Sequence, residues 1–130
     1  MRNFEDAAQV LGELEQRLMD VLWQTAPLTV REVGARLGKT RLAYTTVMTT
    51  LDRLYKKGLL SRVKAGLAYA YRPAMDRAEY HRRVVAAAVT PLLEQGSAPV
   101  LAAFVEAAAD VDDENLARLE QLIAARRNKP

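Results

Sequence analysis

Hydroxyl and basic side chains are concentrated in residues 41–60, RLAYTTVMTTLDRLYKKGLL. Threonines stand at positions 45, 46, 49 and 50, and basic residues follow at positions 53, 56 and 57. A threonine offers a hydroxyl to a base edge or a phosphate and a methyl to a thymine, while Lys and Arg neutralise phosphates. Because threonine lowers helix propensity, its repetition here favours a role in contact with another molecule. The pattern is typical of a helix that enters the major groove of DNA.

A helical wheel separates these side chains from the apolar ones. Val47, Leu51 and Leu54 share one face, and most of the threonines and basic residues fall on the opposite face. Further contacts are expected from the turn before this helix, the start of the preceding helix and the hairpin that follows. The predicted DNA-binding residues are Thr29, Arg31, Arg41, Thr45, Thr46, Thr49, Arg53, Lys56, Arg62 and Lys64. A solvated surface is the alternative for the threonines of the helix, and a purely capping role is an equal alternative for Thr29.

The charge distribution supports a polyanionic partner. Residues 29–73 contain ten basic and two acidic residues, a net charge of +8, whereas the segments before and after carry −3 and −2. A basic segment of this density is expected to lie against nucleic acid or another anionic surface. A solvated basic face is the alternative on charge alone.

Three helices and a hairpin would position these residues. Apolar spacing predicts a helix over residues 11–23, a short one from Val30 that buries Val33 and Leu37, and a third from about residue 43 to 57. Thr29 and Glu32 have the spacing of a capping box. Residues 59–72 change to strand periodicity about a turn at Ala65-Gly66, which places Arg62 and Lys64 near the tip. This order predicts a winged helix-turn-helix.

The remainder of the chain is expected to be helical and to hold two copies together. The sequence predicts residues 1–75 as the DNA-binding domain and residues 76–130 as a dimerisation domain, with breaks at Pro91 and at Gly96–Pro99 and with helix caps at Ser97 and at Asp112 or Asp113. The short helices have apolar stripes that need a partner, most simply a second copy of the chain. The predicted dimer interface comprises Leu101, Phe104, Val105, Leu116, Leu119, Leu122 and Ile123.

Several classes of function have no support in the sequence. The chain has no cysteine, and its one histidine, His81, stands beside two arginines with no second ligand, so neither a metal site nor a cofactor is expected. No paired carboxylates or glycine-rich phosphate loop suggest an enzyme. The uncharged runs reach only about half of the roughly 20 residues that a membrane span needs. Glu5 and Asp6 stand where a secretory signal would have an apolar stretch. We therefore expect a cytoplasmic protein without membrane insertion.

Four stretches together resemble the penicillinase repressor family. They are LGELEQRLMDVLW, LTVREV, AYTTVMTTLDRLYKKGLL and AYAYRPAMDRAEY, and LAAFVE resembles the family's carboxy-terminal segment. The resemblance implies a winged-helix domain followed by a helical dimerisation domain, and a homodimer that blocks transcription by binding a palindromic double-stranded DNA operator. In some members, it also implies relief of repression by a membrane sensor protease that detects β-lactams.

The sequence departs from the family at the cleavage motif. Staphylococcal members are cut before the phenylalanine of Asn-Phe-Val-Glu, and here Ala103 stands in place of the asparagine before Phe104. Cleavage is therefore an open part of the prediction. Two other functions also stay open: a winged-helix protein-interaction module and a non-specific architectural DNA binder.

Overall fold

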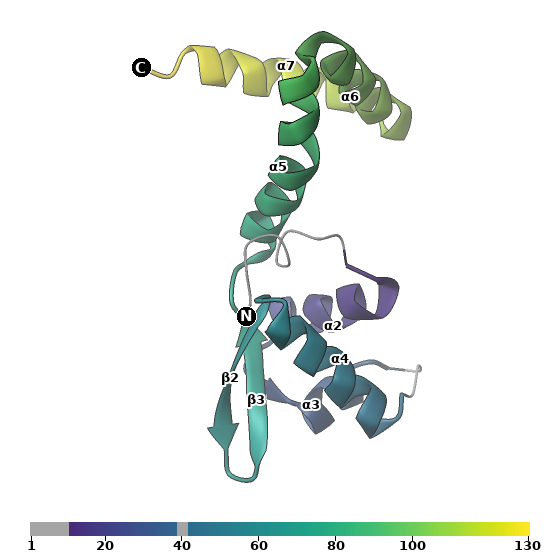
Figure 1. Cartoon of the computed structure of the whole chain (residues 1–130), viewed down its shortest axis with the longest axis vertical. Helices are drawn as coiled ribbons and strands as arrows, with labels where there is room; N and C mark the ends of the chain where they lie inside the picture. Colours follow the sequence, from purple (N-terminus) through teal and green to yellow (C-terminus); the bar gives the residue numbers. More distant parts are fainter. Residues whose placement is uncertain (1–10, 39–41) are drawn as a thin grey trace. The chain divides into compact units, whose positions relative to one another are not determined.

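The computed structural model describes residues 11–38 and 42–130 and divides them into two compact units (Figure 1). The first unit ends at Ala87 and the second extends from Ala88 to Pro130. This boundary follows packing and lies inside a helix. The functional division predicted after residue 75 stays a prediction.

The first unit contains the three predicted helices, α2 (Glu13–Gln24), α3 (Val30–Ala35) and α4 (Tyr44–Lys56). The predicted capping box at the start of α3 is confirmed, because the Thr29 hydroxyl accepts from the Glu32 amide and the Glu32 carboxylate accepts from the Thr29 amide. Helix α4 ends at Lys56, and Gly58 two residues later has a φ of 86°, which is accessible to glycine at little cost.

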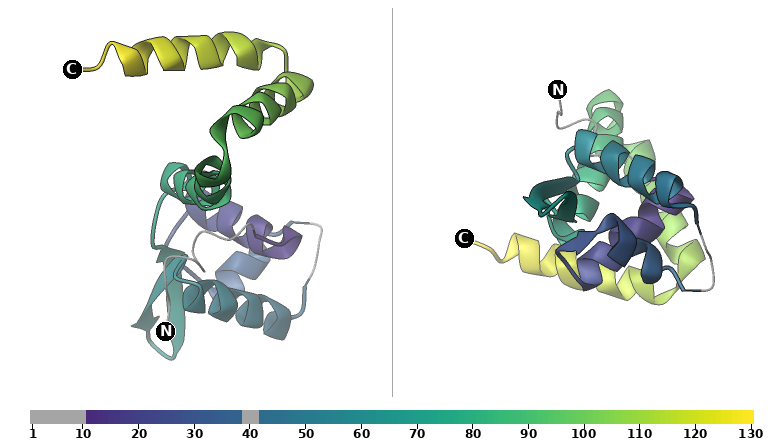
Figure 2. Two further views of the ribbon diagram at one scale, coloured as in Figure 1. Left: turned by 45° about the horizontal axis from the view of Figure 1, so that its top comes forward. Right: turned by 90° about the horizontal axis from the view of Figure 1, so that it is seen from below.

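The hairpin joins a short strand in a three-stranded antiparallel sheet. The strands are β1 (Leu28–Thr29), β2 (Leu60–Ala65) and β3 (Ala68–Pro73), in the order β1-β3-β2. Strand β1 was not predicted, since two residues are too short to show strand periodicity. The helices α2, α3 and α4 lie together to one side of the hairpin in the views of Figures 1 and 2.

The predicted turn of the hairpin is wrong by one residue. Ala65 pairs with Ala68 and Arg62 with Tyr71, so the turn is Gly66-Leu67 rather than Ala65-Gly66. Only Gly66 has a positive φ in this turn, at 68°, which is typical of a glycine at the first central position. The predicted turn would have required a positive φ at Ala65 as well.

A single hydrophobic core holds the first unit together. Its fully buried side chains come from α2, α3, α4, the residue before β2 and the first residue of β2: Leu18, Met19, Leu22, Val33, Val47, Leu51, Leu54, Leu59 and Leu60. Thr50 is the one threonine of α4 that is buried, and its hydroxyl donates to the Thr46 carbonyl at 2.7 Å. The other threonines of this helix are exposed, so their hydroxyl and methyl groups can contact a partner.

Helix α5 (Arg77–Gln95) begins on the first unit. The Tyr80 ring is buried beside Trp23, with centroids 5.7 Å apart, and its hydroxyl accepts from the Leu11 amide. The predicted break at Pro91 is wrong, because the helix continues through it to Gln95. Pro91 has no amide hydrogen, so the carbonyl of Ala87, four residues earlier, loses its helical hydrogen bond. Both residues are exposed, so water can satisfy that carbonyl.

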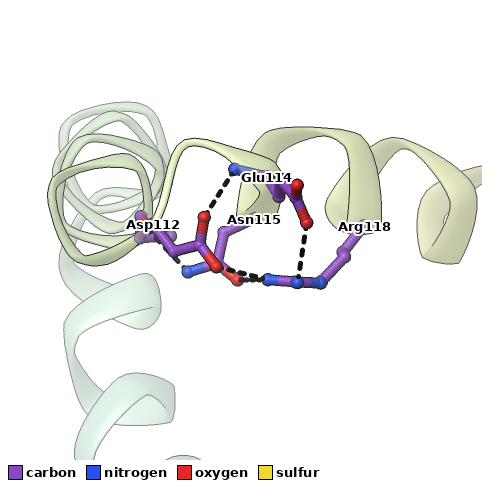
Figure 3. A network of polar contacts seen from close by, with 5 residues as sticks. Asp112, Glu114, Asn115 and Arg118 are labelled. Atoms are coloured by element: carbon purple, nitrogen blue, oxygen red, sulfur yellow. Dashed lines mark hydrogen bonds and ion pairs between the residues drawn. The ribbon is translucent and has the colours of Figure 1, made fainter.

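The second unit is built from the end of α5 and from α6 (Ser97–Val111) and α7 (Glu114–Arg127). The predicted cap at Ser97 is wrong, since Gly96 occupies the N-cap and Ser97 is already helical. At the α6–α7 turn the Asp112 carboxylate accepts from the Glu114 amide, and Arg118 donates to Asp112, Glu114 and Asn115 (Figure 3). This network fixes the turn between the two helices.

Candidate nucleic-acid interface

Helix α4 presents a polar and basic face to solvent, which we call the α4 face. It comprises Thr45, Thr46, Thr49, Arg53 and Lys56, all of them exposed. The opposite side of the same helix is formed by Val47, Leu51 and Leu54, which are buried. Packing of this apolar stripe therefore fixes the rotation of α4 and directs the hydroxyl and basic side chains outward.

The α4 face is hollowed along its carboxy-terminal half. Thr49, Asp52, Arg53, Lys56 and Lys57 line a shallow depression of about 360 Å³. Lys57 is already engaged, because its ammonium is 2.8 and 3.1 Å from the two carboxylate oxygens of Glu15 on α2. Arg53 and Lys56 thus supply the outward positive charge on this half of the helix.

One carboxylate lies within this basic surface. Asp52 is 2.9 Å from Lys56 Nζ and 3.2 Å from Arg62 Nη1. The hydrogen bond from Lys56, followed by that from Arg62, lowers the pKa of Asp52 from its ordinary value. Asp52 is not among the residues predicted from the sequence, although its spacing of four from Lys56 is the signal of an ion pair along a helix.

The hairpin of β2 and β3, which we call the wing, carries two of the predicted DNA-binding residues, and the position of one of them differs from the prediction. Arg62 does not lie near the tip: it pairs with Tyr71 in the middle of the hairpin, and its side chain is only 22% exposed. Its guanidinium lies 4.0 Å from the centroid of the Tyr55 ring and 4.2 Å from that of Tyr69. Lys64 is exposed one pair before the turn, where it can reach a phosphate.

Two of the predicted contact residues, Thr29 and Arg31, lie at the start of α3. Arg31 is exposed, and with Val30, Gly34, Leu42, Tyr44 and Val47 it lines a second depression of about 340 Å³ between α3 and α4. The Thr29 hydroxyl is occupied by its cap. Tyr44, which was not predicted as a contact residue, is half exposed at the start of α4 and lines the same depression. Arg41 lies outside the described residues.

The predicted dimer residues gather in the second unit. A groove of about 480 Å³ between α6 and α7 is lined by six of them and by one glutamate: Leu101, Phe104, Val105, Leu116, Leu119, Ile123 and Glu120. Phe104 is 46% exposed even though it lies at the groove. The seventh predicted residue, Leu122, is exposed on α7 and is not part of this lining.

The described ranges contain neither a candidate metal site nor a helix that could span a membrane. Residues 11–38 and 42–130 contain no group of three or more His, Asp or Glu side chains that could hold a metal ion. In the same ranges, no helix combines the length and the apolar character needed to cross a bilayer.

The capping box predicts a dependence of stability on pH. The backbone hydrogen bond from Thr29 lowers the pKa of Glu32 below its ordinary 4.5, so its ionised form is favoured in the folded state. This contribution is complete above pH 4.5 and is lost as the pH falls through the lower folded-state pKa. In thermal melts, we expect Glu32→Gln, which keeps the box but not the charge, to lose less stability than the wild type below pH 4.5. An equal loss in both proteins would contradict the assignment.

Comparisons with known proteins identify the chain's relatives. The model of the penicillinase repressor family matches residues 11–125. The transcriptional regulator BlaI of Mycobacterium tuberculosis is 40% identical over 124 residues, which cover 92% of this chain and 90% of that protein. The penicillinase repressor of Bacillus licheniformis is 34% identical over 71 residues, which cover 54% of this chain and 56% of that protein.

A solved structure shows the same fold for the first unit. The solution structure of the DNA-binding domain of the repressor BlaI aligns with a TM-score of 0.51 and 32% identity, and covers 62% of this chain and 94% of that domain. The winged helix-turn-helix predicted from the order of elements is therefore confirmed.

Proposed function

Because the chain belongs to the penicillinase repressor family of DNA-binding transcriptional repressors, we propose that it binds a palindromic operator as a homodimer. In this proposal α4 enters the major groove and the wing lies against the adjacent sugar–phosphate backbone. The observation that carries it is the α4 face, where hydroxyl and basic side chains are exposed on one side of a helix whose other side is buried.

The chemistry of the α4 face suggests a division of roles. Thr45 and Thr49 lie in the first half of α4, where the side chains of a recognition helix reach base edges. Arg53 and Lys56 follow one and two turns later, and their charges suit phosphate oxygens. Thr46 lies at the edge of the face. We assign base contacts to the threonines and phosphate contacts to the two basic residues, with Lys64 and Arg31 contacting the backbone on either side.

The groove of the second unit supports the dimer. Leu101, Phe104 and Val105 of α6 and Leu116 and Ile123 of α7 are all exposed around it. An apolar groove of this kind is covered at little cost by the same surface of a second copy, since a two-fold axis pairs identical surfaces. Two-fold symmetry of the protein would be matched by two-fold symmetry of the operator.

The proposal is tested with DNA that the protein itself selects. A palindromic site isolated from random-sequence DNA is compared with a scrambled duplex by fluorescence anisotropy at low salt and at about 150 mM salt. We expect saturation at two chains per site and an operator preference of about 10³ or more. Equal affinity for both duplexes would indicate an architectural DNA binder, and no affinity for either would indicate a protein-interaction module.

Thr49 provides a test of base reading. Thr49→Val keeps the shape and the methyl group but removes the hydroxyl, and Thr49→Ser keeps the hydroxyl and removes the methyl. We expect at least one of them to lower the preference for operator over scrambled DNA about fivefold, equivalent to about 1 kcal/mol for a lost base contact. Thr90→Val, at an exposed position of α5, is the matched control. Unchanged preference in both Thr49 variants would contradict the assignment.

The proposal includes relief of repression by proteolysis, which would cut one peptide bond. By resemblance to members that are cut before the matching phenylalanine, cleavage would fall between Ala103 and Phe104, which lie exposed within α6, although Ala103 stands where those members have asparagine. Cleavage there would separate Phe104 and all of α7 from the first unit, and would thus remove the groove that the dimer needs. Because the bond lies in a helix, a membrane sensor protease would have to unwind α6 locally before it could act.

A further inference from the structure

Arg62 makes three kinds of contact, two of which join the wing to α4. Its guanidinium forms an ion pair with Asp52 of α4 at 3.2 Å and donates to the Tyr71 hydroxyl at 3.5 Å. It also lies over the rings of Tyr55 on α4 and Tyr69 on β3. A side chain held between two rings and a carboxylate is not available to follow a phosphate without losing these contacts.

The position of Asp52 is unfavourable for DNA binding when charge alone is considered. The carboxylate lines the same depression as Thr49, Arg53 and Lys56, and this surface is the one that would approach phosphates. A negative charge there repels DNA. Within the described ranges, Arg62 is the one wing residue with which Asp52 forms an ion pair.

We propose that Asp52 and Arg62 form a clamp that holds the wing at a fixed place beside α4, and that both act as positioning residues for operator binding. The inference rests on the proposed function. The clamp sets where Lys64 stands relative to the α4 face, so that wing and helix reach the same duplex together. Lys56 is the second partner of Asp52 and offsets its remaining charge on the DNA side.

The clamp makes a prediction of opposite sign to that of simple electrostatics. Asp52→Asn removes one negative charge from the DNA surface, so charge alone predicts tighter binding to every duplex. The clamp predicts weaker operator binding, by about tenfold or about 1.4 kcal/mol, and little change on scrambled DNA. Asp110→Asn, at an exposed position of α6, removes the same charge elsewhere and should leave the preference unchanged.

Variants of Arg62 separate positioning from phosphate contact. If Arg62 bound a phosphate, Arg62→Lys would retain most of the affinity. In the clamp, lysine cannot stack on both tyrosine rings with a planar group, so Arg62→Lys should behave like Arg62→Ala. The double variant Asp52→Asn with Arg62→Ala should lose no more operator affinity than Arg62→Ala alone, because both substitutions disrupt one unit.

The outcomes distinguish the clamp from the proposed function. Thermal melts first establish that each variant is folded. If the wild type itself shows no preference for a selected operator, the proposed function fails. If the wild type is selective but Asp52→Asn binds operator and scrambled DNA more tightly by the same factor, or if Arg62→Lys restores binding, the clamp is wrong.

Discussion

Phe104→Asp should convert the protein to monomers and lower its affinity for the full operator by about 10³-fold, the order of the avidity that links two binding modules. Phe104 stands at the apolar groove between α6 and α7. A carboxylate there would have to lose its hydration when a second copy covers the groove, which is unfavourable without a partner charge. Once the dimer is lost, each chain binds its half-site independently.

Sedimentation velocity and anisotropy measure the two effects separately. Val111→Asp is the matched control, because Val111 ends the same helix, is 83% exposed and does not line the groove. A duplex with a single half-site should bind the wild type and Phe104→Asp equally, since the first unit is unaltered. An unchanged sedimentation coefficient for Phe104→Asp would place the interface elsewhere.

The sequence predicts best those features that rest on local patterns. The capping box of Thr29 and Glu32 and the rotation of α4 depend on residues three or four apart, so both follow from spacing alone. The exposed face of α4 is the direct consequence, and the threonines that lower its helix propensity lie on it. Thr50 is the exception, since it is buried and bonds to its own helix.

Features that depend on distant partners could not be predicted. Strand β1 exists only because Leu28 and Thr29 pair with Tyr71 and Ala70, more than 40 residues away. The predicted place of Arg62 at the hairpin tip was wrong for a similar reason: its actual partners come from α4 and β3, and the hairpin register was displaced by the turn. A basic residue on a wing is compatible with phosphate contact until its neighbours are known.

A proline in the sequence does not by itself predict the end of a helix, as α5 shows. Pro91 costs α5 a backbone hydrogen bond, but at an exposed position water can replace that bond, and the helix continues. Gly96 does end the helix. The apolar residues of α6 and α7 were recognised as a set because their stripes had no partner within the sequence, and the structure gathers most of them around one groove.

Arg53→Ala combined with Lys56→Ala tests the electrostatic part of the interface. The two side chains are exposed on the α4 face, and the side chain of Lys56 is 74% exposed even though it pairs with Asp52. A dimer would lose four phosphate contacts, so the slope of log K against log salt should fall by about 3.6. Affinity at about 150 mM salt should drop by about 10²-fold or more, and by similar factors on operator and scrambled DNA.

The matched control removes the same charge from another place. Arg126→Ala with Arg127→Ala also lowers the net charge of the chain from +3 to +1, but both residues lie in the last turn of α7. If long-range attraction by the net charge were responsible for binding, both double variants would lose affinity equally. Loss confined to the α4 variant would locate the phosphate contacts on that helix. A lowered preference for operator, with an unchanged salt slope, would instead assign Arg53 and Lys56 to bases.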